Sequence, residues 1–329
     1  MTGTLVLESE DLRMVLTPDI GGTVTDIHHK RLGQSVLGRV PWNVVRQPDP
    51  DLFAADESVW LTRYSGGWPL MFPNAGDACR FRGAEHGFHG EASLAPWQAT
   101  RIEHGVQLQR RFRVVPVRMT RTFTLDGDVL LLTETAEADG ADEVPVMWGQ
   151  HVTFGSDLLD GPVVIEAGAT RVRVDDAYDP PLNPWVAGAA GVWPSLPTKD
   201  GISEGTRPGG PMASLAYLTD FAHPFVAIRR LDGVVGAVMS WQGDVYNSVW
   251  YWCELGGTPD PPWQGYGRLI GLEPCSTEQA HGLTEAARTG ARLIRLCPGH
   301  PVTATLRLHV FRPAGAVTGT DPDGRATMG

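Results

Sequence analysis

The chain has 329 residues, of which 42% are hydrophobic and 20% are charged, and its formal net charge is -11 at pH 7. This composition is ordinary for a globular protein, and no stretch approaches the roughly 18 consecutive apolar residues that a membrane helix needs. The acidic balance disfavours a nucleic-acid partner, because such proteins normally carry a basic patch. We therefore expect neither a membrane nor a nucleic acid as partner.

The cysteines and the amino terminus say more about the protein's surroundings. Cys79, Cys253, Cys275 and Cys297 are widely spaced and form no CxxC pair, which argues against a zinc site and against a disulfide framework. The amino terminus, MTGTLVLESEDLRMVL, lacks the basic and apolar regions of a secretion signal. The sequence thus predicts reduced cysteines, no metal and a cytoplasmic location.

Short alternating runs of Val, Ile, Leu, Thr and Phe recur between Gly and Pro along the whole chain. TLVLES and LRMVLTP begin the series, and VTATLRLHVFR at 302–312 ends it. Between them, residues 106–138 alternate in three runs, with Asp126 and Gly127 supplying the tight turn of a hairpin. This pattern predicts an all-β protein with a large antiparallel sheet.

Three other segments complete the predicted organisation. Residues 197–211 are rich in Gly, Pro and charge and predict a long loop or lid. Residues 276–290 are the best helix candidate, although Gly282 in the middle weakens it. With no fixed-period repeat to indicate a propeller or solenoid, we expect a single domain over residues 1–312 and a flexible tail over 313–329.

Candidate functional residues lie in three glycine-rich and aromatic stretches: 68–97, 146–155 and 270–282. His151 lies among aromatic residues on a predicted strand; a lone histidine in such a setting is either a core residue or one that faces a pocket. Glu273 ends an apolar run and precedes a proline, so it is either a turn residue or a carboxylate in apolar surroundings. Such surroundings raise a carboxyl pKa toward the range of a general base.

The stretch 68–97 also contains two histidines, His86 and His89, flanked by Glu85 and Glu91. As a metal signal this group is weak, because no third ligand has an evident geometry; the alternative is a glycine-rich loop whose histidines bond the backbone. Cys275 and Ser276 lie in no nucleophile motif. Hydrolase chemistry is therefore not expected.

Taken together and in this order, the three stretches resemble the aldose 1-epimerase (galactose mutarotase) family and its glucose-6-phosphate 1-epimerase-like relatives. The resemblance spans roughly residues 10 to 312. It rests on Gly66, Gly67, Pro69, Pro73 and Asn74, on His89-Gly90 with Trp97, on Gly149-x-His151 with Phe154, on VWYW at 249–252, and on Leu272-Glu273-Pro274.

The resemblance implies an antiparallel β-supersandwich, galactose mutarotase-like in fold, with a sugar cleft on its concave face. It makes Glu273 the general base and His151 the general acid, and it gives sugar contacts to Asn74 and to His89, with His86 as the alternative. Anomer exchange needs a base at the C1 hydroxyl and an acid at the ring oxygen. Two such groups suffice, so no cofactor is expected.

The chain also departs from the family pattern. Ala75 stands where the family has a sugar-binding Arg, so Arg80 or Arg82 would have to replace it, and Asp220 is out of register with the family's substrate-binding Asp. Arg63 adds to this arginine group, which is either a phosphate site or an ordinary solvated set. The alternatives are therefore other acid/base chemistry (lyase or isomerase) on a modified or phosphorylated sugar, or non-catalytic carbohydrate binding; the sequence does not indicate an oligomeric state.

Overall fold

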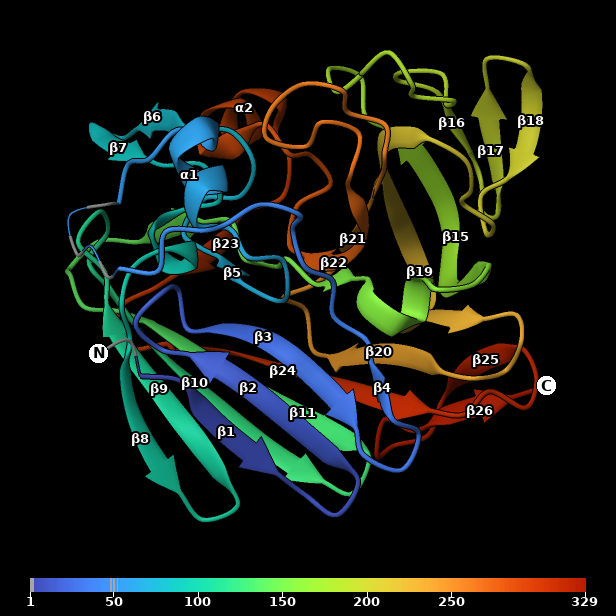
Figure 1. Ribbon diagram of the computed structural model, residues 1–329. Helices are drawn as coiled ribbons and strands as arrows, with labels where there is room; N and C mark the ends of the chain where they lie inside the picture. The colour runs from blue at the N-terminus through green and yellow to red at the C-terminus, as the bar shows by residue number, and fades with distance from the viewer. Residues whose placement is uncertain (1–2, 48, 50, 52) are drawn as a thin grey trace.

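The computed structural model describes residues 3–329 except 48, 50 and 52 (Figure 1). Within this part of the chain, most strands form one antiparallel sheet of 14 strands. Its main path, in spatial order, is β5 (Leu70–Met71), β13 (Gly149–Gln150), β22 (Arg268–Cys275), β21 (Ser248–Leu255), β19 (Met212–Arg230), β20 (Gly236–Gln242), β24 (Val302–Phe311), β11 (Val129–Ala138), β10 (Val117–Asp126), β9 (Gly105–Arg111) and β8 (Gln98–Ile102). Beside it, β14 (Thr153–Phe154) pairs with β22, and β15 (Val163–Val174) pairs with β19 and with β16 (Ala190–Val192).

A second sheet of four strands packs on the first. It consists of β1 (Leu5–Glu8), β2 (Leu12–Thr17), β3 (Thr23–His29) and β4 (Gln34–Ser35). Alternation puts Leu12, Met14 and Leu16 on the inner face, where they share one core with Leu130 and Leu132 of β11. The two sheets cover each other at the lower part of Figure 1, as the predicted all-β class requires.

The predicted meander is confirmed. β9, β10 and β11 pair in sequence order, and the β10–β11 register runs from Val117 opposite Ala138 to Asp126 opposite Val129. Gly127 closes the turn with a φ of 56°, a conformation that glycine adopts without steric cost.

The remaining elements are short. Three hairpins are β6 (Cys79–Phe81) with β7 (Ala84–His86), β17 (Ser195–Thr198) with β18 (Gly201–Glu204), and β25 (Val317–Thr320) with β26 (Ala326–Met328). A further two-stranded pair joins segments distant in sequence, β12 (Val144–Val146) and β23 (Ile294–Leu296). The helices are α1 (Glu57–Arg63) and α2 (Gly282–Thr289), with 3-10 turns at η1 (Glu91–Ser93) and η2 (Ser156–Leu159).

Three segments differ from the sequence-based expectation. Residues 197–211 were predicted as a loop or lid, but their first half belongs to the β17–β18 hairpin. In the helix candidate 276–290, Gly282 begins α2 and so does not interrupt it. Residues 313–329 form the β25–β26 hairpin, not a flexible tail, and Val317 is buried against Phe225 and Phe311.

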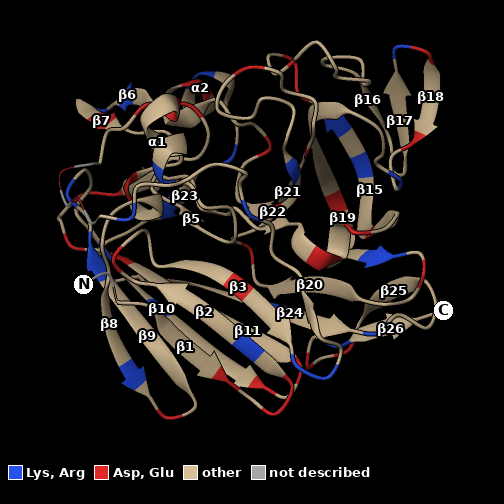
Figure 2. Cartoon of the chain, in the orientation of Figure 1, with Lys and Arg blue, Asp and Glu red and all other residues tan. Residues whose placement is uncertain are grey.

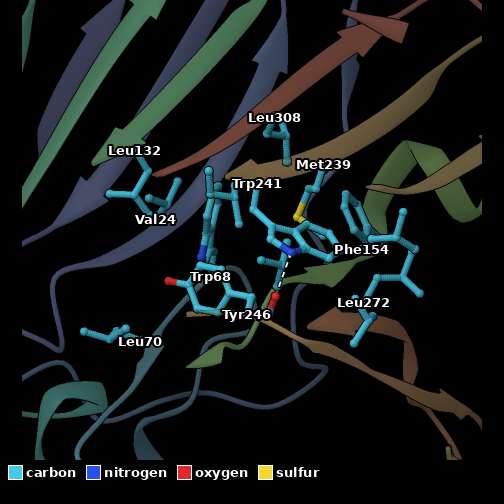
Figure 3. Packing of buried hydrophobic residues seen from close by; sticks show 14 of the residues in the cluster. Val24, Trp68, Leu70, Leu132, Phe154, Met239, Trp241, Tyr246, Leu272 and Leu308 are labelled. Atoms are coloured by element: carbon cyan, nitrogen blue, oxygen red, sulfur yellow. Dashed lines mark hydrogen bonds between the residues drawn. The ribbon is translucent and has the colours of Figure 1, made fainter. Parts of the chain in front are cut away.

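The core continues beneath the upper part of the molecule. Trp68, Phe154, Trp241, Tyr246 and Leu272 pack together there, and the Trp241 indole N–H donates to the Tyr246 carbonyl at 2.9 Å (Figure 3). Charged residues of both signs are scattered over loops and strand edges (Figure 2). Among the described helices, none is both long and apolar enough to cross a membrane.

Candidate active site

Strand register places His151 beside Glu273. Gly149 of β13 lies opposite Cys275, and Thr153 of β14 lies opposite Gly271. In an antiparallel pair this register makes residues 151 and 273 cross-strand neighbours. The Nε2 atom of His151 is accordingly 3.7 Å from Oε1 of Glu273.

The Glu273 carboxylate is buried above a glycine. Only 2% of the residue is exposed. A Cβ atom on Gly271, two residues earlier on the same face of β22, would lie 2.2 Å from Glu273 Oε1. Gly271 therefore leaves the space that the carboxylate occupies. Burial raises the pKa of Glu273 well above its ordinary value.

His151 is buried with an unused polar atom. The residue is 6% exposed, and its Nδ1 has no hydrogen-bond partner among the described residues. Burial lowers the pKa of His151 to about 4. An orphaned buried polar atom is costly in a folded protein, and the described residues leave Nδ1 in that state.

His89 completes the polar floor of the pocket. Its ring lies 4.8 Å from that of His151, centroid to centroid, and the Gly76 amide N–H donates to its Nδ1 at 3.0 Å. This bond leaves Nε2 as the N–H donor of the neutral ring. Burial, with a contribution from neighbouring His151, lowers the pKa of His89 well below its ordinary value.

Helix α1 supplies one wall. The Asp56 carboxylate caps it by accepting the Val59 amide N–H at 2.9 Å. Glu57, Trp60 and Tyr64 then lie on one face at helical spacing. Trp60 stacks on Tyr64 with centroids 4.4 Å apart, and both rings contact His151.

These groups line a pocket of about 180 Å³. Trp250, Trp252, Trp263, Phe88 and Tyr178 complete its largely aromatic wall. Such a wall, with a few convergent polar groups, is typical of small-molecule sites.

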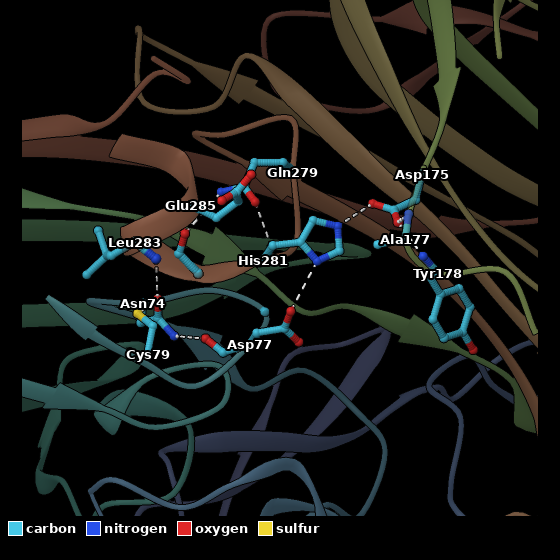
Figure 4. A network of polar contacts seen from close by, with 12 residues as sticks. Asn74, Asp77, Cys79, Asp175, Ala177, Tyr178, Gln279, His281, Leu283 and Glu285 are labelled. Carbon is cyan, nitrogen blue, oxygen red and sulfur yellow. Dashed lines mark hydrogen bonds and ion pairs between the residues drawn. The ribbon is translucent and has the colours of Figure 1, made fainter. Parts of the chain in front are cut away.

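The pocket mouth contains a histidine between two carboxylates. His281 Nδ1 is 3.1 Å from Asp77 Oδ2, and Nε2 is 3.0 Å from Asp175 Oδ2 (Figure 4). Asp175 is fully buried; it also accepts the amide N–H groups of Ala177 and Tyr178 and the Tyr217 hydroxyl. Hydrogen bonds from its ring to both carboxylates raise the pKa of His281 to about 10, so its ring is an imidazolium at neutral pH.

Asp175, Asp176 and His281 also bring potential metal-ligand atoms within 4.8 Å of one another. The imidazolium does not fit a metal here, because a histidine ligand must have a deprotonated ring nitrogen. Both nitrogens of His281 instead face carboxylates. The arrangement fits a salt-bridged cluster.

The sequence-predicted substrate-binding residues divide into two groups. His89 lines the pocket, whereas Asn74, Arg80 and His86 do not appear among its described lining residues. Arg80 is exposed and pairs with Glu85. His86 is buried on β7, next to the ring of Phe81. This placement argues against direct sugar contact by Arg80 or His86.

Asn74 instead joins three segments of the mouth. Its amide N–H groups donate to the carbonyls of Asp77 at 2.8 Å and Gly87 at 2.9 Å, and its Oδ1 accepts the Leu283 amide N–H at 2.8 Å. Asn74 is fully buried. Its polar atoms are thus occupied in positioning the loops that carry Asp77, His89 and His281.

The other arginines considered for a phosphate site also lie elsewhere. Arg63 donates to the Gln47 carbonyl and pairs with Asp49. Arg82 donates to the Glu143 carbonyl and lies over the Phe81 ring. No Arg or Lys occurs among the described residues that line the pocket.

Sequence reasoning missed α1 and the charged mouth. The string DESVWLTRY carries an N-cap aspartate and an aromatic pair four residues apart, which is a signal for a short helix. Asp77 and His281 are 204 residues apart in sequence, and no local pattern indicates their contact.

The sequence matches no family model and no curated protein. Among solved structures, the chain is similar to Slr1438 of Synechocystis sp. PCC 6803, with a TM-score of 0.68, 19% identity and coverage of 95% of this chain and 97% of that one. A protein of Escherichia coli K12 provisionally named an aldose 1-epimerase has a TM-score of 0.68, 18% identity and coverage of 94% and 99%. A galactose mutarotase-like protein of Clostridium acetobutylicum has a TM-score of 0.63, 14% identity and coverage of 94% and 95%.

These similarities extend over nearly the whole of each chain. They agree with the single large antiparallel sheet and its smaller partner sheet. The chain therefore has the galactose mutarotase-like fold.

Proposed function

We propose that the protein is an aldose 1-epimerase-like isomerase that interconverts sugar anomers by acid/base ring opening. The observation that carries this proposal is the buried pair of His151 Nε2 and Glu273 Oε1, 3.7 Å apart in an aromatic pocket. The C1 hydroxyl and the ring oxygen of an aldose are bonded to the same carbon atom. Two groups this close can therefore serve both oxygens at once.

In the proposed reaction, the Glu273 carboxylate takes the proton of the C1 hydroxyl while the His151 imidazolium gives one to the ring oxygen. The C1–O5 bond breaks and an open-chain aldehyde forms. Rotation about C1–C2 and reversal of both proton transfers give the other anomer. The wall of Trp60, Tyr64 and Trp252 holds the sugar and limits water at the reacting atoms.

Burial supports these proton transfers. It raises the pKa of Glu273 and lowers that of His151, so burial favours the uncharged form of each group. Ring opening leaves the pair in this same form. The site is thus suited to the open-chain state, which is the high-energy species of the reaction.

Glu273→Gln tests the proposal. We expect anomer exchange, measured by saturation-transfer NMR on a panel of aldoses, to fall by about 10²- to 10⁴-fold. Sugar binding should persist, because the amide keeps the size of the carboxyl group. Wild-type protein that accelerates exchange of no aldose would overturn the proposal.

A second candidate is different acid/base chemistry on a modified sugar, such as a lyase or isomerase step. Ala75, where the resembled family has a sugar-binding Arg, favours it, and Ala75 is fully buried. This candidate predicts the same loss in Glu273→Gln with a substrate that is not a simple aldose. A product analysis by NMR distinguishes a new double bond from a new anomer.

A further inference from the structure

The mouth of the pocket is rich in negative charge. Glu57 and Asp77 line it, and Asp175 and Asp176 lie behind His281. His281 is the one cationic side chain among the described lining residues. Glu57, Asp77, Asp175 and Asp176 thus outnumber the single imidazolium in this region.

The imidazolium is not available to a ligand. Both of its nitrogens face carboxylates, at 3.1 Å and 3.0 Å, so it has no free N–H for a phosphate or carboxylate oxygen. Arg173, whose guanidinium lies over the ring of Tyr217, donates to the Glu278 carbonyl. An anionic ligand group would meet carboxylates here without a free cation to bind it.

Asp77, in contrast, is held in place while one of its carboxylate oxygens accepts no hydrogen bond from the described residues. Its amide N–H donates to the Ala280 carbonyl at 3.0 Å, its carbonyl accepts from Asn74, and its Oδ2 faces His281. Its side chain is 58% exposed, and no hydrogen bond to Oδ1 occurs within the described part of the chain. Asp77 thus presents a fixed, partly free carboxylate to the pocket mouth.

Two further observations suit this same pocket to a ligand. The buried Nδ1 of His151 has no partner among the described residues, and Trp60, Trp252, Trp263, Phe88 and Tyr178 surround the space. Aromatic faces beside carboxylates are the usual setting for an ammonium group, which gains from both. Burial and, after it, the charge of neighbouring Asp77 raise the pKa of Glu57, and a bound cation would relieve the repulsion between the two carboxylates.

We propose that this pocket selects a sugar bearing a protonated amino group, which Asp77 and Glu57 bind at the mouth, and that it rejects phosphorylated sugars. The inference rests on the proposed function in that the ligand is a sugar. It does not depend on which reaction follows. Asp77 is the specificity-determining residue, and His281 positions it.

The test compares binding to the full-length protein of four matched probes: glucose, 6-amino-6-deoxyglucose, 2-amino-2-deoxyglucose and glucose 6-phosphate. Binding is measured at pH 6.5 and low salt by the fluorescence of the pocket tryptophans. We expect at least one amino sugar to bind about tenfold more tightly than glucose, which corresponds to about 1.4 kcal/mol. N-acetylglucosamine, which lacks the charge, should lose the advantage, and glucose 6-phosphate should bind more weakly than glucose.

Asp77→Asn and Glu57→Gln remove one carboxylate each. Each variant should reduce the ratio of amino-sugar to glucose affinity from about tenfold to about threefold or less. This is the ratio expected when one of two carboxylates, and with it about half of the binding free-energy difference, is removed. Glu103→Gln, which removes an exposed carboxylate paired with His104 on the β8–β9 turn, is the matched control and should keep the ratio. If Asp77→Asn fails to fold, Glu57→Gln and the loss of preference in high salt still decide the question.

Equal binding of glucose and both amino sugars by the wild-type protein would overturn the inference. So would tighter binding of glucose 6-phosphate, or an unchanged ratio in both variants. These results are separate from the failure of the proposed function, which concerns catalysis by His151 and Glu273. Amino-sugar selectivity without anomer exchange would uphold the inference and overturn the proposed reaction.

Discussion

Among the almost fully buried glutamates of the large sheet, Glu134 and Glu273 are surrounded in opposite ways. Glu134 on β11 is 1% exposed, and Glu273 on β22 is 2% exposed. Arg121, the cross-strand neighbour of Glu134, donates to its Oε1 at 2.6 Å. Trp148, Gln150 and Tyr246 donate to its Oε2 at 2.8, 2.6 and 3.1 Å.

Glu273 has no such support. No hydrogen bond to its carboxylate occurs among the described residues, and the titratable group beside it is His151, whose own pKa is lowered. A buried charge is stable only when it is paired and bonded. The comparison teaches that Glu134 is built into a network of hydrogen bonds, whereas Glu273 is buried without such bonds, as suits the general base that we propose.

Replacing a glutamate by glutamine should have its largest effect at Glu134, on the free energy of unfolding. Glu134→Gln leaves the Arg121 guanidinium buried without its anion, so we expect the free energy of unfolding to fall by about 3 to 5 kcal/mol. Urea denaturation measures it. Glu137→Gln, on the same strand and in an exposed pair with Arg118, is the control and should cost at most about 1 kcal/mol. An equal small loss at both sites would contradict a structural role for Glu134.

The space around Glu273 can be tested without changing its charge. Gly271→Ala puts a Cβ atom where the carboxylate lies, so Glu273 must move, and a displacement of about 1 Å in a catalytic group costs on the order of 10²-fold in rate. Steady-state kinetics should show this loss chiefly in kcat. Gly209→Ala, in open space, should leave the rate unchanged, and equal rates for the wild type and Gly271→Ala would show that the carboxylate position is not critical.

The pH dependence of kcat/KM should report the shared proton. Catalysis needs one proton on the His151–Glu273 pair; below the pKa of His151, about 4, both groups are protonated and no base is left. We expect kcat/KM to fall about tenfold per pH unit below this value. Near-ultraviolet circular dichroism at each pH shows that the fold persists. A fall centred near the ordinary histidine value of 6.5 would contradict the burial argument.

The smallest expected effect is a gain in stability. The folded pKa of Glu273 is raised, so its favourable contribution is complete below its ordinary pKa of 4.5 and is lost as pH rises through the folded value. Gln stays neutral throughout, so Glu273→Gln should make the protein more stable than the wild type at pH 7. The difference in Tm should vanish below pH 4; a variant less stable than wild type at pH 7 would contradict it.

Much of the fold was predictable because it follows from local sequence patterns. Alternation and the Asp126-Gly127 turn predict the β9–β11 meander, and the observed register confirms it. The error at 313–329 has a physical reason: β25 and β26 are short, and Val317 gains its burial from Phe225 and Phe311, which are distant in sequence. Tertiary contacts of this kind leave no local signal.

The site was partly predictable for the same reason. His151, Glu273 and His89 stand in motifs, and the structure brings all three to one pocket; their roles remain proposals. The mouth was not predictable, because Asp77 and His281 come from two loops that are distant in sequence. Asn74 holds these loops together, although the resemblance made it a sugar ligand. Position in a motif does not reveal whether a side chain faces a ligand or a neighbouring loop.

The way the pocket is divided between sheet and loops has a consequence for how its specificity can change. His151 and Glu273 are fixed by backbone pairing around β22, where a one-residue slip in register would turn either side chain to the other face. Glu57, Asp77 and His281 come from α1 and from two loops. Substitutions at the mouth can therefore alter the accepted ligand while the acid/base pair stays intact, so selection can act on recognition and on chemistry separately.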